Sequence, residues 1–321
     1  MIVPIAMAVY NGERYIRQQL ESFVRQDRLP DELVICDDGS TDATVKIIEE
    51  MLGELPFIVR FYKNETNLGY CKNFEKAISL CDGELIFLSD QDDFWFNDKI
   101  SSLYSWMSER PDFLIAQSNM EITDASLRPS GVTQLDNFLG LGHTKKDFIT
   151  GCGAVLRKKL LEVALPFPAS GWGHDNWLFN IAMSIGKTGV YERPLMYYRR
   201  HESTVSNHFA SSVKKLSKLD ALKKSGLSDS TIGWRNEIQR CRDVSERIAS
   251  ASQSGLSPED FPSIEENLVK LALRIDALNF RIKLVRVPRW RRFFPAFLFW
   301  LRSGYAPFKG WKSFAKDCIR P

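Results

Sequence analysis

Three carboxylates lie within four positions of one another, at Asp90, Asp92 and Asp93, directly after the apolar run 84–89. An apolar run of that length is typical of a buried strand whose carboxyl end opens into a loop. Like charges this close raise one another's pKa unless a cation compensates them, and a hard divalent ion bridging to a phosphate is the usual compensation. The stretch therefore predicts a ligand site at a strand end. A solvated acidic turn is the alternative.

Other polar residues follow expected strands or begin a later helix: Tyr10 and Asn11 after 2–9, Asp37 and Asp38 after 32–36, and Asp175 at a loop-to-helix start. The carboxyl ends of parallel strands gather at one edge of a sheet. An acidic edge of this kind can hold a nucleoside through hydrogen bonds to base and ribose, with a metal ion neutralising the diphosphate. Neither Gly-x-x-x-x-Gly-Lys-Ser/Thr nor Gly-x-Gly-x-x-Gly occurs, so P-loop and dinucleotide chemistries are disfavoured.

Alternating strands and helices must position these residues. We expect strands at 2–9, 32–36, 57–62 and 84–89. The helices between them are expected at 15–24, from a cap at Ser40 or Thr41 to about residue 51, and at 67–80. This order predicts an α/β fold with a mostly parallel sheet flanked by helices. Further on we expect strands at 113–122, 148–156 and 190–198, helices ending near 165 and 185, and a polar connection over 123–146.

Strand signals end after residue 206, and helices are expected at 213–224, 231–253 and 260–285. We therefore divide the chain into an α/β domain, 1–205, and an all-helical appendage, 206–321. The first holds 21 Lys and Arg against 29 Asp and Glu, whereas the second holds 22 against 11. A basic module of this kind predicts an acidic partner, either a nucleic acid or an anionic membrane surface.

Arginines and aromatic residues are mixed in the last helical stretch, whose apolar part runs from Phe293 to Leu301. It is far shorter than the ~20 residues that span a bilayer. The mixture is typical of a helix lying in a membrane interface. The alternative is an apolar helix packed on its own domain or in a homodimer.

The six cysteines show no Cys-x-x-Cys pair, and we expect them to be buried free thiols of a reducing compartment. Met1 leads directly into a strand-like run without a basic segment or cleavage site, which favours a cytoplasmic protein.

In their order and spacing, these motifs resemble the family-2 inverting glycosyltransferases of the GT-A fold, over about residues 2–205. The resemblance rests on Val9-Tyr-Asn11-Gly, Val34-Ile-Cys-Asp-Asp-Gly-Ser-Thr-Asp42, Asn67-Leu-Gly69, Ser89-Asp-Gln-Asp-Asp-Phe-Trp95, His174-Asp175 and Tyr198-Arg-Arg-His201. The segments Leu-Gly-Tyr-x-Lys-Asn-Phe and Ser-Asp-Gln-Asp-Asp look most like the bacterial branch that builds O-antigen and other surface polysaccharides, which includes many rhamnosyltransferases.

The resemblance implies roles for individual residues. Tyr10 and Asp38 would contact the nucleobase with Asp37 beside them, and Asp175 would be the catalytic base. The implied donor-binding residues are Tyr10, Asn11, Asp37, Asp38, Asn67, Lys72, Asp90 and Asp92. The implied ligands of a Mg²⁺ or Mn²⁺ ion are Asp92, Asp93 and His201, with Asp93 favoured as the most direct ligand. Cys71-Lys72-Asn73 replaces the family's usual Ala-Arg-Asn, which leaves open the cation beside the diphosphate.

The implied activity is inverting transfer of a hexose, with L-rhamnose as one candidate, from a UDP, dTDP or GDP donor to a saccharide acceptor. A lipid-linked acceptor and peripheral attachment to the inner face of the cytoplasmic membrane would suit the basic aromatic tail. One alternative is a nucleotidyltransferase that makes the activated sugar, although such an enzyme would be expected to carry a Gly-rich basic loop near its N-terminus. The other is a non-enzymatic nucleic-acid-binding protein that uses the basic region 206–321, although no recognition module is evident. Asp175 could instead be only a helix cap, and His201 a solvated strand end. Trp172 and Trp177 could stack on sugars or belong to the core.

Overall fold

The structure is a computed structural model that describes residues 1–202, 209–225, 231–253 and 264–320. Two compact units divide the chain, Met1–Ala221 and Leu222–Pro321. The predicted domain boundary at 205/206 falls outside the residues that the structure describes, whereas the two units divide later, at 221/222. After the short helix Phe209–Ser211 the chain still packs on the first unit, because Asn137 Nδ2 donates to the carbonyl oxygens of Ala210 (3.2 Å) and Ser212 (2.8 Å).

The first unit begins with regularly alternating strands and helices: β1 (Pro4–Val9), α1 (Ile16–Val24), β2 (Glu32–Asp37), α2 (Thr44–Met51), β3 (Ile58–Lys63), α3 (Tyr70–Ser79), β4 (Leu85–Ser89) and α4 (Lys99–Ser108). These elements confirm the expected order. One local prediction is wrong: neither Ser40 nor Thr41 caps α2, which starts at Thr44 after Ala43. The Ser40 hydroxyl is directed instead to the carboxylate of Asp37.

The rest of the unit contains elements that sequence periodicity only partly predicts: β5 (Phe94–Trp95), β6 (Phe113–Thr123), β7 (Pro129–Thr133), α5 (Gln134–Gly140), β8 (Ala154–Arg157), α6 (Leu161–Ala164), α7 (His174–Ile185) and β9 (Lys187–Arg199). The helix α8 (Lys218–Ser225) spans the boundary between the two units. The expected polar connection over 123–146 contains β7 and α5. The expected strand at 148–156 begins only at Ala154, because Gly151 and Gly153 interrupt the apolar run with a turn.

All strands of the unit join one sheet in the order β3-β2-β1-β4-β8-β6-β9-β5, with β7 paired to β6. The first four are parallel, with Ile5 opposite Leu33 on one side and Phe87 on the other. β8 is antiparallel to β4 and β6, β6 and β9 are parallel, and β5 is antiparallel to β9. The predicted mostly parallel sheet is confirmed.

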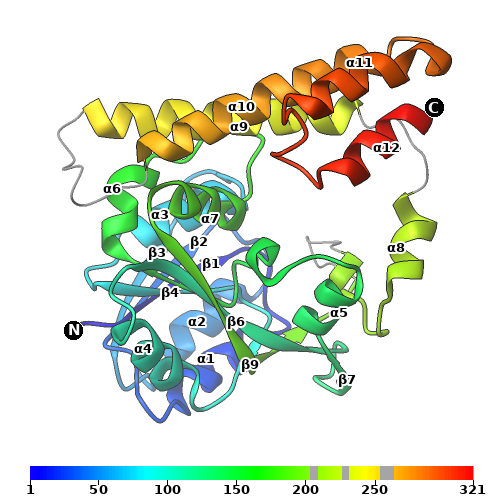
Figure 1. Ribbon diagram of the computed structural model, residues 1–321. Coiled ribbons are helices and arrows are strands. Elements are labelled where there is room, and N and C mark those ends of the chain that lie inside the picture. Colours follow the sequence, from blue (N-terminus) through cyan, green and yellow to red (C-terminus); the bar gives the residue numbers. More distant parts are fainter. Residues whose placement is uncertain (203–208, 226–230, 254–263, 321) are drawn as a thin grey trace. The chain divides into compact units, whose positions relative to one another are not determined.

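Helices cover both faces of this sheet (Figure 1): α1, α2 and α4 lie on one face, and α3 and α7 on the other. Alternate residues of β1, such as Ile5 and Met7, pack in one cluster with Leu20 of α1 and Ile100 of α4. A strand turns successive side chains to opposite faces, so a completely buried strand such as β1 supplies both layers. The sheet is therefore a rigid base for the loops at its edge.

The second unit contains α9 (Thr231–Gln253), α10 (Ile264–Leu284), α11 (Arg289–Leu301) and α12 (Trp311–Ile319). Trp234 and Ile238 of α9 pack with Leu278 and Ile282 of α10. The guanidinium of Arg281 also binds both carboxylate oxygens of Asp317, at 2.7 and 2.9 Å. A bidentate ion pair of this kind stabilises two buried charges that would each be costly if they were unpaired.

The expectation of free thiols is confirmed for all six cysteines, and Cys36, Cys81, Cys152 and Cys241 are buried. Within the described residues, no helix combines the length and apolar character needed to cross a membrane.

Gly83 offers a test of how tightly the N-terminal end of β4 is packed. A Cβ at this position would lie 2.1 Å from Cδ of Pro4 and 2.4 Å from the carbonyl oxygen of Ile2. We expect Gly83→Ala to lower the free energy of unfolding by about 1–3 kcal/mol through overpacking, measured by urea denaturation. Gly53→Ala is the matched control, because a Cβ at Gly53 has no neighbour within 4 Å. Equal stability of the two variants would contradict this packing.

Candidate functional site

Loops after β1, β2 and β4 are joined by side-chain-to-backbone hydrogen bonds. The amide of Gln91 accepts from the Tyr10 N–H at 2.7 Å and donates to the Tyr10 carbonyl oxygen at 2.8 Å. Asn11 has a left-handed backbone, with φ of 48°; its N–H donates to Ser40 Oγ at 2.8 Å and its Oδ1 accepts from Thr41 N–H at 2.8 Å. The Tyr10 side chain remains 47% exposed, so its ring is accessible to a ligand.

Asp37 and Asp38 are both buried, and their carboxylates hold the surrounding loop. Asp38 accepts hydrogen bonds from Leu68 N–H (2.8 Å), Gly69 N–H (2.9 Å) and Asn64 Nδ2 (2.8 Å). Asp37 accepts from the N–H groups of Gly39 and Ser40, at 3.2 and 3.0 Å. The two carboxylates therefore hold the surrounding loops in shape through hydrogen bonds within the chain.

Asn67 and Lys72 lie before and inside the first turn of α3. Asn67 Nδ2 donates to the backbone carbonyl of Asp38 at 3.0 Å, which ties this turn to the β2 loop. Lys72 Nζ donates to the Phe167 carbonyl oxygen at 2.6 Å and pairs with Glu75. The Lys72 ammonium thus links α3 to the segment before α7.

Asp92 pairs with His201 across the loop that joins β4 to β5. Asp92 Oδ2 lies 2.8 Å from His201 Nε2, and Arg199 Nε donates to the backbone carbonyl of Asp92 at 2.7 Å. His201 follows β9, far along the chain, and the pairing of β5 with β9 brings it to residues 90–93, which form the acidic loop. A carboxylate and an imidazole that face one another form a donor set suited to a divalent cation, so these residues fit a metal ion.

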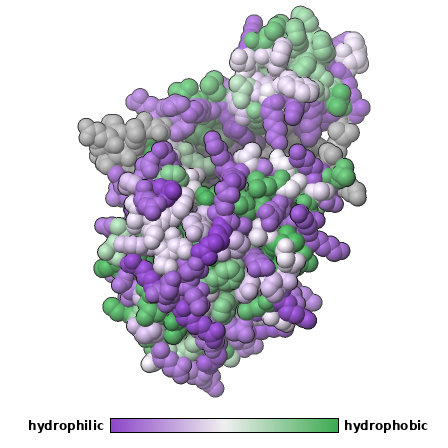
Figure 2. Space-filling model, turned by 60° about the horizontal axis from the view of Figure 1, so that its bottom comes forward, coloured by the Kyte–Doolittle hydropathy of each residue, from purple (hydrophilic) through white to green (hydrophobic). Residues whose placement is uncertain are grey.

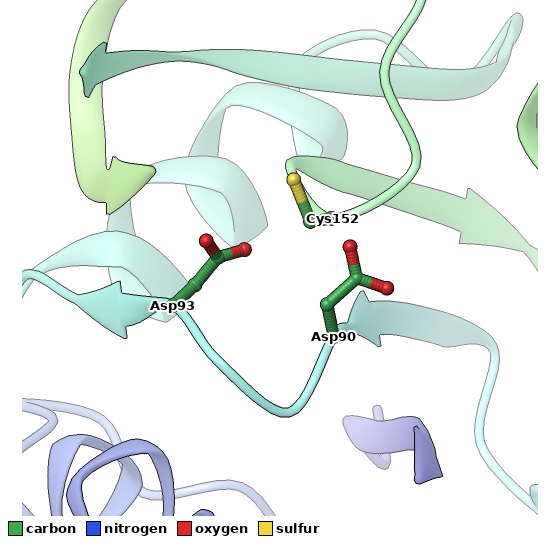
Figure 3. Close-up of side chains that lie close together, drawn as sticks. All are labelled: Asp90, Asp93 and Cys152. Atoms are coloured by element: carbon green, nitrogen blue, oxygen red, sulfur yellow. The ribbon is translucent and has the colours of Figure 1, made fainter. Parts of the chain in front are cut away.

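Asp90 and Asp93 converge on Cys152 from the opposite ends of the same loop (Figure 3). One potential ligand atom of each residue lies within 4.8 Å of those of the other two. Burial raises the pKa of Asp90 to about 7, and the charges of Asp92 and Asp175 act in the same direction. Burial also raises the pKa of Asp93, whose Oδ2 has no hydrogen-bond partner in the part of the chain that the structure describes. We call Asp92 and His201 the outer pair and Asp90, Asp93 and Cys152 the inner cluster. Within the inner cluster Asp93 and Cys152 are buried and Asp90 is partly exposed.

Asp175 lies in the first turn of α7, where its Oδ1 accepts from the Asn176 N–H at 2.6 Å. It also contributes to the raised pKa of both Asp90 and Tyr70, which shows that it is electrostatically coupled to the acidic loop and to α3. The neighbouring His174 is buried and stacks on Phe74 with ring centroids 3.8 Å apart. Asp175 therefore lies on the turn of α7 that packs against α3.

Trp172 and Trp177 are 6% and 1% exposed and meet edge to face, with centroids 5.2 Å apart. Trp177 Nε1 donates to the Ala164 carbonyl oxygen at 2.7 Å. Of the two alternatives, stacking on sugars or a place in the core, this burial favours the core.

Several residues of the site were not singled out from the sequence: Gln91, Lys99, Cys152 and Arg199. Gln91 and Arg199 lie inside the motifs on which the family resemblance rests. Their position in the sequence beside the expected ligands is the signal that could have identified them. No pattern in the sequence indicates a role for Lys99 or Cys152. Only the packing of segments that are far apart in the sequence brings these two residues to the site.

The model of Glycosyl transferase family 2 matches residues 5–164. An uncharacterized protein of Mycobacterium tuberculosis (strain H37Rv) is 37% identical over 105 residues, which cover 32% of this chain and 30% of that protein. The chain thus spans less than a third of that relative's length. The dTDP-rhamnosyl transferase RfbG of Shigella flexneri is 30% identical over 215 residues, which cover 61% of this chain and 72% of that protein.

Solved structures are similar in fold. Residues 1–349 of Staphylococcus aureus TarS, in complex with UDP, superpose with a TM-score of 0.56 at 17% identity, covering 99% of this chain and 89% of that one. Mannosyltransferase PcManGT from Pyrobaculum calidifontis, in complex with GDP-Man and Mn²⁺, gives a TM-score of 0.51 at 16% identity, covering 99% and 84%. These matches confirm the expected fold.

The pH dependence of stability tests the surroundings of His174. Both its ring nitrogens lack a hydrogen-bond partner among the described residues, and burial lowers its pKa against the opposing charge of Asp175. Below the ordinary histidine pKa of about 6.5 the unfolded chain therefore binds a proton that the folded chain resists, so stability falls with falling pH.

We expect the difference in Tm between pH 7.5 and pH 5.5 to be smaller in His174→Gln than in the wild type. The control is His143→Gln, which changes an exposed histidine of the same unit and should keep the wild-type pH dependence. Identical pH dependence in all three proteins would show that His174 does not resist protonation.

Proposed function

Because the chain belongs to glycosyl transferase family 2, we propose that it moves a sugar from a nucleoside-diphosphate donor to a saccharide acceptor, with inversion at the anomeric carbon. The observation that carries this proposal is the meeting of three elements at one sheet edge. The β4–β5 loop brings Asp90 and Asp92, the end of β9 brings His201, and α7 brings Asp175. The similarity to a dTDP-rhamnosyl transferase makes L-rhamnose the first donor sugar to test.

We assign the donor to the loops after β1 and β2. The exposed ring of Tyr10 can stack on a base, and Asp38, with Asp37 beside it, borders the same loop. Asn11 and Asn67 keep these loops in place through the hydrogen bonds described above. Asp90 and Asp92 come next along the edge, where they can meet the ribose and the diphosphate, and Lys72 is the nearest candidate cation on α3.

We assign a divalent ion, Mg²⁺ or Mn²⁺, to the outer pair of Asp92 and His201, which supply one oxygen and one nitrogen ligand. When bound, such an ion acts as a Lewis acid on the negative charge of the departing diphosphate. Asp93, expected to be the most direct ligand, lies at the back of the loop, is 1% exposed and faces Asp90 and Cys152. Mn²⁺ binding to the donor-free protein tests its part: a loss of affinity in Asp93→Asn equal to that in Asp92→Asn would make Asp93 a metal ligand.

Asp175 is the proposed general base. A sugar hydroxyl has a high pKa, so a positioned carboxylate has to take its proton while the oxygen attacks the anomeric carbon. In that step the new C–O bond forms, the bond from the anomeric carbon to the diphosphate breaks, and the proton passes to Asp175. A single displacement of this kind inverts the configuration. Because the Asn176 N–H holds one carboxylate oxygen of Asp175, the other is left to the acceptor.

We further propose a lipid-linked acceptor and peripheral attachment to the inner face of the cytoplasmic membrane. Aromatic side chains of the second unit are strongly exposed: Trp290 (76%), Phe293 (59%), Phe294 (67%) and Trp311 (63%). Figure 2 shows hydrophobic surface gathered at the upper right, among hydrophilic side chains. Exposed cations surround these rings: Arg286, Arg289, Arg291, Arg302, Lys309, Lys312 and Lys316. Asp317 is the single acid of residues 286–320, and it is buried against Arg281.

Asp175→Asn tests the base. The variant should lose about 10²–10⁴-fold in the rate of sugar transfer while keeping donor binding, because the side chain keeps its size and its place on α7. Donor binding is measured as thermal stabilisation by UDP-, dTDP- and GDP-sugars, each with and without Mn²⁺ or Mg²⁺. Asp136→Asn, which changes an exposed acid at the start of α5, is the control and should transfer normally.

Stabilisation of the wild type by one donor, only when metal is present, is the expected result and would identify the nucleotide. Loss of donor binding in Asp175→Asn would count against its assignment as base. A wild-type protein that responds to no donor, with or without metal, would overturn the proposed activity.

Membrane attachment is tested by vesicle flotation. The protein should float with vesicles that contain phosphatidylglycerol and not with pure phosphatidylcholine, since each basic residue near an anionic surface contributes about 1 kcal/mol. Trp290→Ala/Phe294→Ala should reduce flotation severalfold, whereas Ile58→Ala, which removes an exposed apolar side chain of the first unit, should not. If the protein ignores anionic vesicles, and truncation before Val287 turns a dimer into a monomer, the aromatic surface is a homodimer contact instead.

A further inference from the structure

The segment between α6 and α7, residues 165–173, leads into the helix that carries Asp175. It has no helix or strand of its own, and it contains Gly171, with φ of 83°, and Gly173. Glycines leave a chain free to adopt many conformations, so such a segment keeps one shape only if other elements hold it. The place of Asp175 therefore depends on what this segment is bound to.

Side chains of α3 hold both backbone polar groups of Phe167, which is 3% exposed. The Phe167 N–H donates to Glu75 Oε1 at 3.1 Å, and the Phe167 carbonyl oxygen accepts from Lys72 Nζ at 2.6 Å. Lys72 Nζ also lies 2.5 Å from Glu75 Oε2, so the two side chains form an ion pair around one residue of the segment. Only 16% of the Glu75 side chain is exposed, and its two charge-assisted contacts are therefore stronger than those of a pair on the open surface.

Two further contacts join α3 to the end of the segment, beside Asp175. The His174 ring stacks on Phe74 of α3, with ring centroids 3.8 Å apart. A Cβ placed on Gly173 would lie 2.8 Å from Asp175 Oδ1 and 3.3 Å from Tyr70 Oη, so the carboxylate and the phenol both border this glycine. α3 therefore contacts the segment near its start and again at its end.

α3 is itself fixed to strand ends of the proposed donor site. Asn73 is 1% exposed, and its Nδ2 donates to the Cys36 carbonyl oxygen of β2 at 2.8 Å. The N–H groups of Leu68 and Gly69, just before the helix, donate to the Asp38 carboxylate. α3 thus connects the loop after β2 to the segment before α7 through hydrogen bonds at both places.

We propose that Glu75 is a positioning residue for the general base: by holding Phe167 it keeps the segment before α7 on α3, and so fixes the place of the Asp175 carboxylate. Glu75 acts through Asp175 and not on the sugar itself. The inference rests on the proposed function, because Asp175 has the role of a base only in that reaction. Lys72 completes the attachment of Phe167 from the same helix.

The first test is amide hydrogen exchange of the donor-free protein, followed by mass spectrometry of peptides that cover residues 165–177. Glu75→Leu removes both of its bonds and should make exchange in these peptides at least about tenfold faster, since hydrogen bonds to charged groups are among the stronger ones in proteins. Glu75→Gln keeps an oxygen for the Phe167 N–H without the charge, so its increase should be smaller. Glu49→Leu, which removes a glutamate of α2 that pairs with Lys63 at the surface, is the control and should leave this exchange unchanged.

Unchanged exchange over residues 165–177 in Glu75→Leu would overturn the proposal. An equal increase over β1 and β2 would also overturn it, because that result shows a general loss of stability. If Glu75→Leu does not accumulate as folded protein, Glu75→Gln decides by the same criterion: an increase confined to residues 165–177 supports the proposal, and any other result overturns it.

The second test is hydrolysis of the donor by water, measured with the nucleotide sugar that stabilises the wild type. Asp175 would take a proton from water as it would from a sugar hydroxyl. A displaced base in Glu75→Leu should therefore lower kcat at least about tenfold while the donor KM stays within about threefold. In an Asp175→Asn background, Glu75→Leu should have no further effect on kcat, because the two changes remove the same contribution.

A further fall of the same size in the Asp175→Asn background would show that Glu75 acts independently of the base, and would overturn the proposal. So would a higher donor KM with unchanged kcat, which would show that Glu75 acts on the donor through Lys72. The exchange test uses no donor, so a protein that passes it but hydrolyses no nucleotide sugar fails only the proposed function.

Discussion

Buried negative charge is the constraint on which the site depends. An unpaired carboxylate inside a protein is costly, so every acid at the sheet edge needs N–H donors or a cation. Asp38 is satisfied by backbone N–H groups of the turn before α3, and Asp92 by His201. Each of these bonds joins segments that are far apart in the sequence. The requirement to balance charge therefore also fixes the loops relative to one another.

The two halves of the sheet contribute differently to this arrangement. The parallel half, β3-β2-β1-β4, supplies neighbouring strand ends and hence the edge on which Tyr10, Asp38 and Asp90 gather. The other half supplies the long strand β9, which pairs with β5 and returns Arg199 and His201 to the acidic loop. The acidic loop is consequently held at both ends by strands, β4 before it and β5 after it.

Buried charge is also balanced within the second unit, where arginines carry most of it. Its one acid within residues 286–320, Asp317, is buried with Arg281, and Arg292 donates to the carbonyl oxygens of Val285, Val287 and Arg320. These bonds use buried arginines to fix the start and end of the α11–α12 segment. The remaining cations and several large aromatic side chains are then left at the surface, and the proposed membrane attachment rests on this composition.

The amino-acid sequence by itself determined the alternation of strands and helices, the mostly parallel sheet and the set of polar strand ends, because these depend on local periodicity and on short motifs. It also indicated the family through the order of those motifs. The tertiary structure alone decided that Trp172 and Trp177 are core, that β7 and α5 lie within a polar stretch, and that Asp93 faces Asp90 and Cys152 while Asp92 faces His201. It also buried Lys99, whose ammonium donates to the Cys152 carbonyl oxygen. Neighbouring aspartates have the same chemistry in a sequence, and only the packing of distant strands, which sets the dielectric and the partners of each carboxylate, makes them different.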